Sequence, residues 1–388
     1  MRCAFFHDHK FFIKNGHVFS SWSFPSRVWD RYLRFFDGVF VFGRKTDNKK
    51  EGVISEKDRV SFTLFPESEF IKSFVLRKKN LIDSIEKILR SVDCAIIRLP
   101  SLTGYIAAEK CRKYNIPYAI EIVGCQWDSY WHYGNLKAKL LAPPLYQKMK
   151  KEVRLATHAI YVTKYFLQTR YPSHGYVAHA SNVMLHELSD SILEKRIIKI
   201  NTPKQNLTIG LLAHYNVKYK GFDIIIKALA ILKKKGYLVK AIFAGSGTSN
   251  HLKKLAHDHG VEKQTSFIGF LKGDEVMRFL DYIDIYVHPS KQEGLPRAVI
   301  EALSRACPVL ASSVAGIPEL VNEKYLHKPG DYKILAYHLQ QIIEKKFDLK
   351  DMAMSNFERA KSYSKDKLDN ERNLFWKKFY EYTKNRGS

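Results

Sequence analysis

The 388-residue chain is long enough for two domains of ordinary size, and an apolar content of 45% with 13% aromatic residues excludes a disordered protein. Its 64 Lys and Arg residues outnumber 39 Asp and Glu residues, and the net charge of +25 attracts polyanions such as nucleic acid, anionic lipid or nucleoside diphosphates. No stretch approaches the roughly 18 uncharged apolar residues of a membrane span, and charged residues within 7–10 interrupt what would be the apolar region of a signal peptide.

The first part of the chain predicts short strands that alternate with helices. Three apolar runs indicate strands: 2–6, 39–42 and 60–65. Aromatic residues at helical spacing predict a core helix over 22–36, and a second helical pattern runs over 70–91. Asn15 and Gly16 follow the first strand, where the pair Asn-Gly ordinarily makes a tight turn.

Two further strands end in residues that could face a ligand. The apolar run 94–97 leads to Ser101, which can cap a helix over 102–114. The next strand, 117–123, carries three candidates at its carboxyl end: Glu121, Gly124 and Asp128. Ligands of open α/β sheets bind at that edge, although an ordinary polar rim is an equally good interpretation of these residues.

Residues 137–154 alternate basic and apolar side chains and predict an amphipathic helix that Pro143-Pro144 interrupts. A basic helix of this kind can lie on anionic lipid. Alternatively, it exposes a solvated basic face while its apolar face packs on the core. Strands over 158–163 and 176–180 would then complete a doubly wound first domain.

After a connector over 185–205, the chain predicts a second unit of the same kind. A strand over 207–212 leads through Lys220-Gly221 to a helix over 222–235, which Gly236 ends in the expected C-cap place. Two more strands follow, 239–244 before Gly245 and Gly247, and 265–268 before Gly269 and Phe270. Glycines at strand ends let bare backbone approach a nucleotide.

The stretch 282–321 predicts strand, loop, helix, strand, loop and helix. The first strand, 285–287, ends at His288-Pro289-Ser290, because proline cannot continue the ladder. A helix over 295–306 follows, with Pro296 in its first turn. Glu293 lies in the loop and points into the crevice at the sheet edge, and Glu301, two turns into the helix, can face the same crevice. Outer helices are predicted over 332–343, 352–362 and 366–382.

Three short motifs occur in order in this stretch: Pro-Ser at 289–290, Glu-Gly-Leu-Pro at 293–296 and Gly-Ile-Pro-Glu-Leu-Val at 316–321. Together with the spacing Glu, seven residues, Glu, they resemble glycosyltransferase family 4, the retaining nucleotide-sugar transferases of the GT-B type. The resemblance implies an α/β fold of two Rossmann-like doubly wound domains that face a central cleft. The expected parts are an acceptor-binding domain over 1–184, to which a C-terminal helix over 366–388 crosses back, a linker over 185–205, and a nucleotide-sugar-binding domain over 206–365.

The resemblance also implies roles for single residues. Glu293 would bind hydroxyls of the donor sugar, Glu301 would hold the ribose diol, and Lys220 would neutralise the diphosphate. The family's clamp arginine has no counterpart after Gly210, so a cation such as Lys218 or Arg297 would replace it. The other donor-side candidates are Gly294, Leu295, Pro296, Gly245, Gly247, Gly269 and Phe270. The acceptor-side candidates are Glu121, Gly124, Asp128, Asn15 and Gly16.

The function implied is retaining transfer of a hexose-type sugar from a nucleoside diphosphate sugar, UDP in preference to GDP. The acceptor would be a hydroxyl of a glycan or lipid-linked glycan in the synthesis of envelope lipopolysaccharide, capsule or exopolysaccharide. No Asp-x-Asp motif follows a strand, so neither a metal nor another cofactor is expected. The five scattered cysteines fit a reducing cytoplasm, and the basic helix predicts a peripheral location on the inner face of the cytoplasmic membrane.

Two other functions stay open. The missing clamp arginine would suit a catalytically silent scaffold of an envelope-synthesis complex, which a transfer assay would distinguish from an enzyme. The net charge would suit a basic nucleic-acid-binding protein, but no zinc-finger, RNP or helix-turn-helix pattern accompanies it, so no specific nucleic-acid partner is expected.

Overall fold

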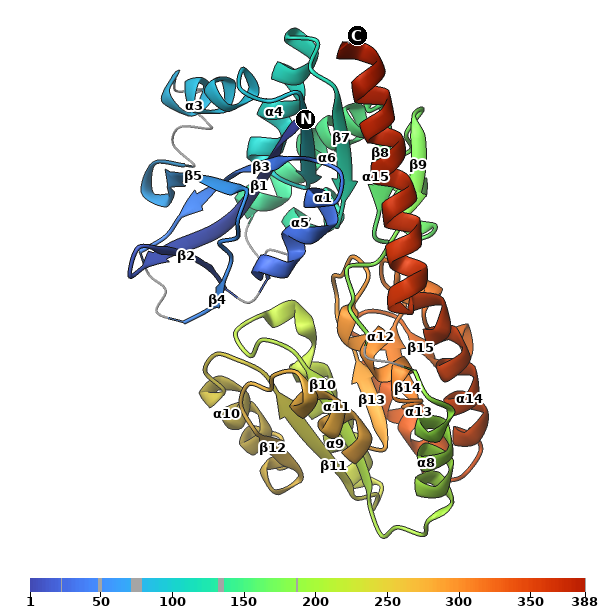
Figure 1. Ribbon diagram of the computed structural model, residues 1–388. Helices are drawn as coiled ribbons and strands as arrows, with labels where there is room; N and C mark the ends of the chain where they lie inside the picture. The colour runs from blue at the N-terminus through green and yellow to red at the C-terminus, as the bar shows by residue number, and fades with distance from the viewer. Residues whose placement is uncertain (22, 48–50, 71–78, 132–135, 186–187, 388) are drawn as a thin grey trace. The chain divides into compact units, whose positions relative to one another are not determined.

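The computed structural model describes the chain except for residues 22, 48–50, 71–78, 132–135, 186–187 and 388. It divides into two compact units, each with its own sheet (Figure 1). The N-terminal unit comprises Met1–Tyr130, residues 136–180 and the C-terminal segment from Asp369 onward. The C-terminal unit comprises Ser181–Leu368 together with Trp131.

The N-terminal unit is built on a sheet of nine strands. Seven strands pair in parallel in the order β5-β3-β1-β6-β7-β8-β9, while β2 and β4 extend β1 with antiparallel pairs. The strands are β1 (Arg2–Lys14), β2 (His17–Ser20), β3 (Gly38–Lys45), β4 (Val53–Ile54), β5 (Val60–Pro66), β6 (Cys94–Leu99), β7 (Tyr118–Ile122), β8 (His158–Tyr161) and β9 (Tyr176–His179). The sheet confirms the predicted doubly wound α/β class.

Strand β1 is much longer than the predicted 2–6. Its first half pairs in parallel with β3 and β6, its register to β3 shifts between Phe6 and Lys10, and its last residues pair antiparallel with β2. Asn15 and Gly16 are the two exposed residues between Lys14 and His17, and both have positive φ, 51° and 79°. This is the geometry of a tight hairpin turn, so the predicted turn is confirmed.

The helices of the N-terminal unit begin with a 3-10 turn, η1 (Ser26–Trp29), and one short helix, α1 (Asp30–Leu33). The predicted helix over 22–36 is therefore too long, because Pro25 precedes the turn and β3 begins already at Gly38. The predicted core role is confirmed, since Trp29 and Tyr32 are fully buried. The remaining helices are α3 (Lys79–Leu89), α4 (Leu102–Lys113), α5 (Gln126–Trp131), α6 (Leu136–Leu155), α7 (Phe166–Arg170) and α15 (Lys365–Gly387). The first residues of the helical pattern over 70–91 lie largely outside the described residues.

Helix α6 runs through Pro143 and Pro144 without a break. The prediction of an interrupted helix is wrong, because the prolines remove only two backbone donors while one face of the helix stays buried on both sides of them. The buried residues of that face are Ala138 and Ala142 before the prolines, and Met149 and Val153 after them.

The C-terminal helix α15 packs on the N-terminal unit from Asp369 onward. Trp376 is fully buried, with its ring 5.3 Å from that of Tyr32. His158 of β8 is buried beneath the same helix, with its ring 5.3 Å from Phe379 and 5.1 Å from Tyr382. Aromatic packing therefore holds the end of the chain on the first sheet.

The C-terminal unit has six parallel strands in the order β12-β11-β10-β13-β14-β15. They are β10 (Leu207–Leu212), β11 (Val239–Ala244), β12 (Thr265–Phe267), β13 (Ile285–His288), β14 (Val309–Ser312) and β15 (Leu326–His327). The helices are α8 (Asp190–Asn201), α9 (Phe222–Lys234), α10 (Asn250–Asp258), α11 (Asp274–Tyr282), α12 (Arg297–Ser304), α13 (Tyr332–Ile343) and α14 (Leu349–Ala360). Short 3-10 turns lie at Lys218–Lys220 (η2), Glu262–Gln264 (η3), Ile317–Glu319 (η4), Glu323–Tyr325 (η5) and Lys361–Tyr363 (η6).

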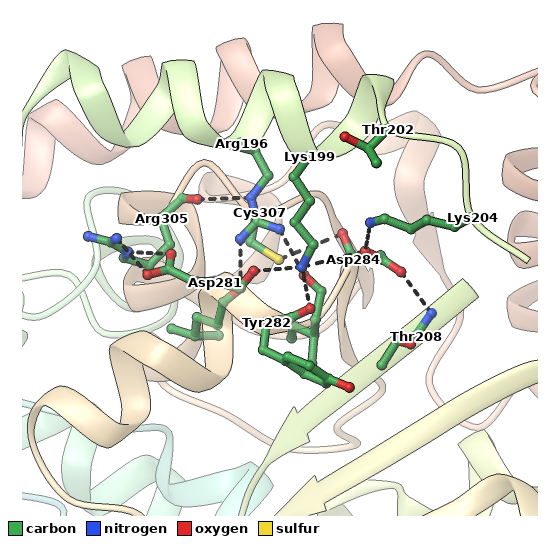
Figure 2. A network of polar contacts seen from close by, with 12 residues as sticks. Arg196, Lys199, Thr202, Lys204, Thr208, Asp281, Tyr282, Asp284, Arg305 and Cys307 are labelled. Carbon is green, nitrogen blue, oxygen red and sulfur yellow. Dashed lines mark hydrogen bonds and ion pairs between the residues drawn. The ribbon is translucent and has the colours of Figure 1, made fainter. Parts of the chain in front are cut away.

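The segment 185–205, expected to be a connector, contains α8, which is anchored in the C-terminal unit (Figure 2). The buried guanidinium of Arg196 donates to three backbone carbonyls: Leu280 (2.6 Å), Ile283 (2.8 Å) and Arg305 (3.2 Å). Lys199, one turn on, donates to the carbonyls of Asp281, Tyr282 and Ile283. These carbonyls end α11 and follow α12, so two cations of α8 satisfy acceptors that the helices cannot satisfy themselves.

Candidate functional site

The site lies at the carboxyl edge of the C-terminal sheet, where the strand order reverses. Strands β10 and β13 are neighbours, and the chain leaves β10 toward β11 on one side and β13 toward β14 on the other. Loops that leave such a pair in opposite directions open a crevice for ligands. The loop after β10 carries Lys220, and the loop after β13 carries Glu293.

These two loops are bound to each other. The amide of Lys291 donates to the carbonyl of Tyr219 at 2.7 Å, and the hydroxyl of Ser290 donates to the same carbonyl at 3.1 Å. At Gly221 the φ of 80° suits glycine, and a Cβ there would lie 2.4 Å from the carbonyl oxygen of Pro289. Only glycine allows this approach, so Gly221 sets the distance between the two loops.

Glu293 and Lys220, the two residues predicted to be catalytic, are in direct contact. The Nζ of Lys220 lies 2.6 Å from Oε1 of Glu293. The Nε2 of His288, the last residue of β13, lies 2.8 Å from the same oxygen. The Glu293 side chain is 9% exposed and that of His288 is 2% exposed. Within the part of the chain that the structure describes, Oε2 of Glu293 makes no hydrogen bond.

The surroundings of Glu293 keep it ionised. Burial alone would raise the pKa of this carboxyl, but the Lys220 ammonium and the hydrogen bond from His288 outweigh burial and lower the pKa to about 2. At neutral pH the group is therefore a carboxylate that can accept hydrogen bonds. It cannot serve as a proton donor there.

A third loop, after β14, joins the same edge. The amide of Gly316 donates to the carbonyl of Gly294 at 3.0 Å, and the hydroxyl of Ser312 donates to the carbonyl of Ser290. The loop around Gly294 is thus held from two sides. The three motifs that carry the family resemblance, at 289–290, 293–296 and 316–321, therefore meet in one network of contacts.

Helix α12 begins at Arg297, two residues later than predicted, with Pro296 as its N-cap residue. Leu295 and Pro296 are buried, so their side chains pack beneath the loop, whereas Arg297 is exposed. Glu301 is half-buried in the middle of the helix.

The predicted nucleotide-side glycines meet at the ends of the neighbouring strands. The amide of Gly245 donates to the carbonyl of Gly269 at 2.7 Å, and the Tyr215 hydroxyl accepts from the amide of Gly269 at 3.1 Å. Gly247, with φ of 97°, lies against the side chains of His214 and Asn216. Phe270 is 45% exposed beyond Gly269, and Lys218 is exposed in η2.

The acceptor-side candidates lie in the N-terminal unit, and two of them are engaged by neighbouring side chains. Glu121 is 5% exposed, and its two oxygens accept from the Tyr32 hydroxyl and the Arg98 guanidinium, both at 2.7 Å. Asp128 forms an ion pair with Arg170 at 3.0 Å. These contacts favour the interpretation of Glu121 and Asp128 as structural polar groups. Gly124 is half-buried, with Pro100 3.7 Å from where a Cβ would stand.

Two polar residues at the ends of parallel strand segments, His288 and Asp8, were not singled out from the sequence. His288 was treated only as the end of a strand, although a polar residue there is bound to lie at the sheet edge. Asp8 lies at the carboxyl end of the parallel half of β1, and its carboxylate accepts from the amides of Leu102 (2.5 Å) and Thr103 (3.0 Å). Together with Ser101, which caps α4 as predicted by accepting from the amide of Gly104 at 3.0 Å, it fills a helix N-terminus that could otherwise bind an anion.

Neither a metal cluster nor a membrane-spanning helix occurs in the described ranges. Outside the gaps in the structure, no three His, Cys, Asp or Glu side chains are grouped so that they could hold a metal ion. Across the same residues, no helix is both long and apolar enough to cross a membrane.

Comparison with known proteins identifies glycosyltransferases, among them one of capsular polysaccharide biosynthesis, as relatives of this chain. The family described as Glycosyl transferases group 1 matches residues 194–361. Protein CapJ of Staphylococcus aureus is 31% identical over 354 residues, 90% of this chain and 88% of CapJ. The capsular polysaccharide biosynthesis glycosyltransferase CapM of the same organism is 28% identical over 162 residues, which are 40% of this chain and 41% of CapM.

Among solved structures, the Anabaena protein Alr3699/HepE in complex with UDP-glucose matches 99% of this chain and 100% of its own, with a TM-score of 0.64 and 17% sequence identity. At that identity the likeness concerns the fold, and it confirms the predicted GT-B class.

Proposed function

Because the chain belongs to the group 1 glycosyl transferases, we propose that it is a retaining hexosyltransferase that uses a UDP-sugar and glycosylates a hydroxyl of an envelope glycan or lipid-linked glycan. The observation that carries this proposal is the contact between Lys220 and Glu293 at the point where the strand order of the C-terminal sheet reverses. The two residues come from loops on neighbouring strands, and the chain keeps both buried enough to act in a partly water-excluded site.

Each residue of the pair suits one part of a nucleotide sugar. As the bond between the sugar and the diphosphate breaks, negative charge gathers on the diphosphate, and the Lys220 ammonium stabilises that charge. The Glu293 carboxylate accepts hydrogen bonds from hydroxyls of the sugar ring and orients it, while Glu301 holds the ribose. The acceptor hydroxyl attacks from the face that the diphosphate leaves, and its proton passes to the departing phosphate oxygen, so the anomeric configuration is retained.

The substrate classes draw support from relatives. The Anabaena protein with this fold was solved with UDP-glucose, which supports a UDP-sugar donor. CapM is named for capsular polysaccharide biosynthesis, which supports an envelope glycan as acceptor. The contact between Lys220 and Glu293 favours an active enzyme over the alternative of a silent scaffold.

Metal independence is part of the proposal. Lys220 can supply part of the positive charge that the leaving diphosphate needs, and no Asp-x-Asp motif follows a strand, so we propose that transfer needs no divalent ion. Transfer should therefore persist with a chelator. Activity that disappeared with the chelator and returned with manganese would contradict this part.

We further propose that the N-terminal half of α6 binds an anionic membrane surface on the cytoplasmic side. Leu136, Leu140 and Leu141 are exposed by 73%, 69% and 50%, unusually high values for three leucines on one helix. Lys137 and Lys139 are exposed between them. Apolar side chains beside lysines suit the boundary between headgroups and acyl chains, where each basic residue contributes about 1 kcal/mol.

A donor screen followed by a transfer assay tests the function. UDP- and GDP-sugars are first compared for thermal stabilisation of the protein, and the donor that stabilises it most is offered with glycan acceptors. We expect stabilisation by a UDP-sugar and a product with the anomeric configuration of the donor in its NMR spectrum. An inverted product would overturn the retaining mechanism, and a protein that neither binds nor transfers any nucleotide sugar would favour the scaffold.

A further inference from the structure

Resting on the proposed function, we propose that His288 is a positioning residue: supported by Tyr286, it holds Oε1 of Glu293 and leaves Oε2 as the atom that receives the donor sugar. Tyr286 and His288 are alternate residues of β13, so their side chains lie on the same face of the strand. Their rings are stacked, with centroids 5.8 Å apart.

In a neutral imidazole, the hydrogen bonds among Tyr286, His288 and Glu293 have one consistent direction. The Glu293 carboxylate can only accept, so Nε2 of His288, 2.8 Å from Oε1, carries the hydrogen. In the neutral ring Nδ1 is then the acceptor, and the Tyr286 hydroxyl, 3.2 Å away, donates to it. Tyr286 is fully buried, so its hydroxyl has a fixed place from which to select this tautomer.

Lys220 alone cannot hold the Glu293 carboxylate in one orientation. Its side chain is 22% exposed, against 2% for His288, and its ammonium is the cation that the diphosphate would attract. When the donor binds, the Lys220 ammonium is shared with the phosphate oxygens, whereas the imidazole stays on Glu293. The two partners of one oxygen therefore have different roles: Lys220 acts on donor binding, and His288 acts on the orientation of the carboxylate.

The consequence for the carboxylate is a defined orientation. Oε1 accepts two hydrogen bonds, and Oε2 accepts none from the residues that the structure describes. A carboxylate that is fixed through one oxygen presents the other in a set direction, so it can meet a sugar hydroxyl without reorganising. Small displacements of such a group reduce turnover strongly, by about 100-fold for 1 Å.

Kinetics of His288 variants test the proposal. His288→Leu should lower kcat by about 10–100-fold and leave the donor KM close to that of the wild type. His288→Gln, whose side-chain amide can donate near the place of Nε2, should recover much of the loss. Lys220→Met should differ by raising the donor KM as well. His338→Leu serves as the matched control, because it removes another buried histidine of the same unit, in α13, away from the site.

Tyr286→Phe removes only one hydroxyl and covers the case in which His288→Leu does not fold. It should lower kcat by a few-fold with an unchanged donor KM. Wild-type kcat in His288→Leu, or in Tyr286→Phe when His288→Leu is unfolded, would overturn the proposal. So would a His288→Gln variant as impaired as His288→Leu when both are folded.

A measurement without substrate separates this proposal from the proposed function. In the ¹⁵N spectrum of histidine-labelled protein, assigned with His288→Gln, the ring of His288 should be the neutral tautomer with hydrogen on Nε2. The Nε2 signal should shift in Glu293→Ala. A hydrogen on Nδ1, or an Nε2 signal unchanged in Glu293→Ala, overturns the positioning role whatever the turnover. If the wild-type protein were inactive with every donor, the proposed function would be wrong, while the spectrum would still decide the positioning role of His288.

Discussion

Replacement of Arg196 by Met should destabilise the C-terminal unit more than any surface change on the same helix. The substitution keeps the apolar stem of the side chain and removes the guanidinium that donates to the carbonyls of Leu280, Ile283 and Arg305. A hydrogen bond from a charged donor contributes about 1.5–3 kcal/mol, and a buried acceptor left without a partner costs about 1–3 kcal/mol. Because bonds within one network do not add, we expect a loss of about 3–5 kcal/mol, as when one partner of a buried charged pair is removed.

Hydrogen exchange followed by mass spectrometry is the assay, because it reports the opening of single helices in a protein of two units. Amides of α8 and of the end of α11 should exchange about 100-fold faster or more in Arg196→Met, since each 1.4 kcal/mol is about tenfold. Lys195→Met is the control, because Lys195 is exposed on the same helix and should change stability by less than about 0.5 kcal/mol. Equal exchange in the two variants would refute the idea that Arg196 anchors α8.

Three further predictions follow from single contacts. Burial, with a contribution from the Lys378 charge, lowers the pKa of His158 to about 4 from 6.5. The N-terminal unit should therefore keep its full stability above pH 6.5 and lose stability as the pH falls toward 4, which unfolding by urea across this range would show. A His158→Phe variant with the same pH dependence would contradict this prediction. Gly221→Ala should cost about 1–2 kcal/mol in backbone strain and reduce turnover, because its Cβ would push against the carbonyl of Pro289. Unchanged kinetics would mean that this contact does not set the distance between the loops that carry Lys220 and Glu293. The double substitution Leu140→Ser and Leu141→Ser should weaken co-sedimentation with anionic vesicles but leave turnover on a soluble acceptor unchanged. If the wild type bound neutral vesicles as well as anionic ones, the membrane proposal would be wrong.

The sequence predicted most strands of the C-terminal unit to within one residue, but it missed the helices α8 and α10. Strand β10 and helix α13 have the predicted bounds, because buried parallel strands are apolar runs and helices show their period locally. The N-terminal unit was predicted less well. The length of β1 and the unbroken α6 depend on pairing and packing with distant residues: Lys10 and Phe11 of β1 pair with β3, and one face of α6 is buried on both sides of its two prolines.

The same distinction applies to the site. Motif resemblance identified Glu293 and Lys220, but their contact joins residues 73 positions apart and could not be deduced from spacing. His288 had no motif of its own, and its role emerges only when the imidazole is seen against the carboxylate. Glu121 had a suitable place at a strand end, yet its partners Tyr32 and Arg98, from other elements, engage both of its oxygens.

The rate of sugar transfer by Glu293→Ala is the most direct test of the account, measured with the donor and acceptor that the wild type uses. The substitution removes the acceptor for the sugar hydroxyls and keeps Lys220 for the diphosphate. We expect kcat to fall by about 100–1,000-fold, while UDP still stabilises the protein against heat. Undiminished transfer by Glu293→Ala would contradict the account, because the carboxylate at the centre of the site would then have no part in the reaction.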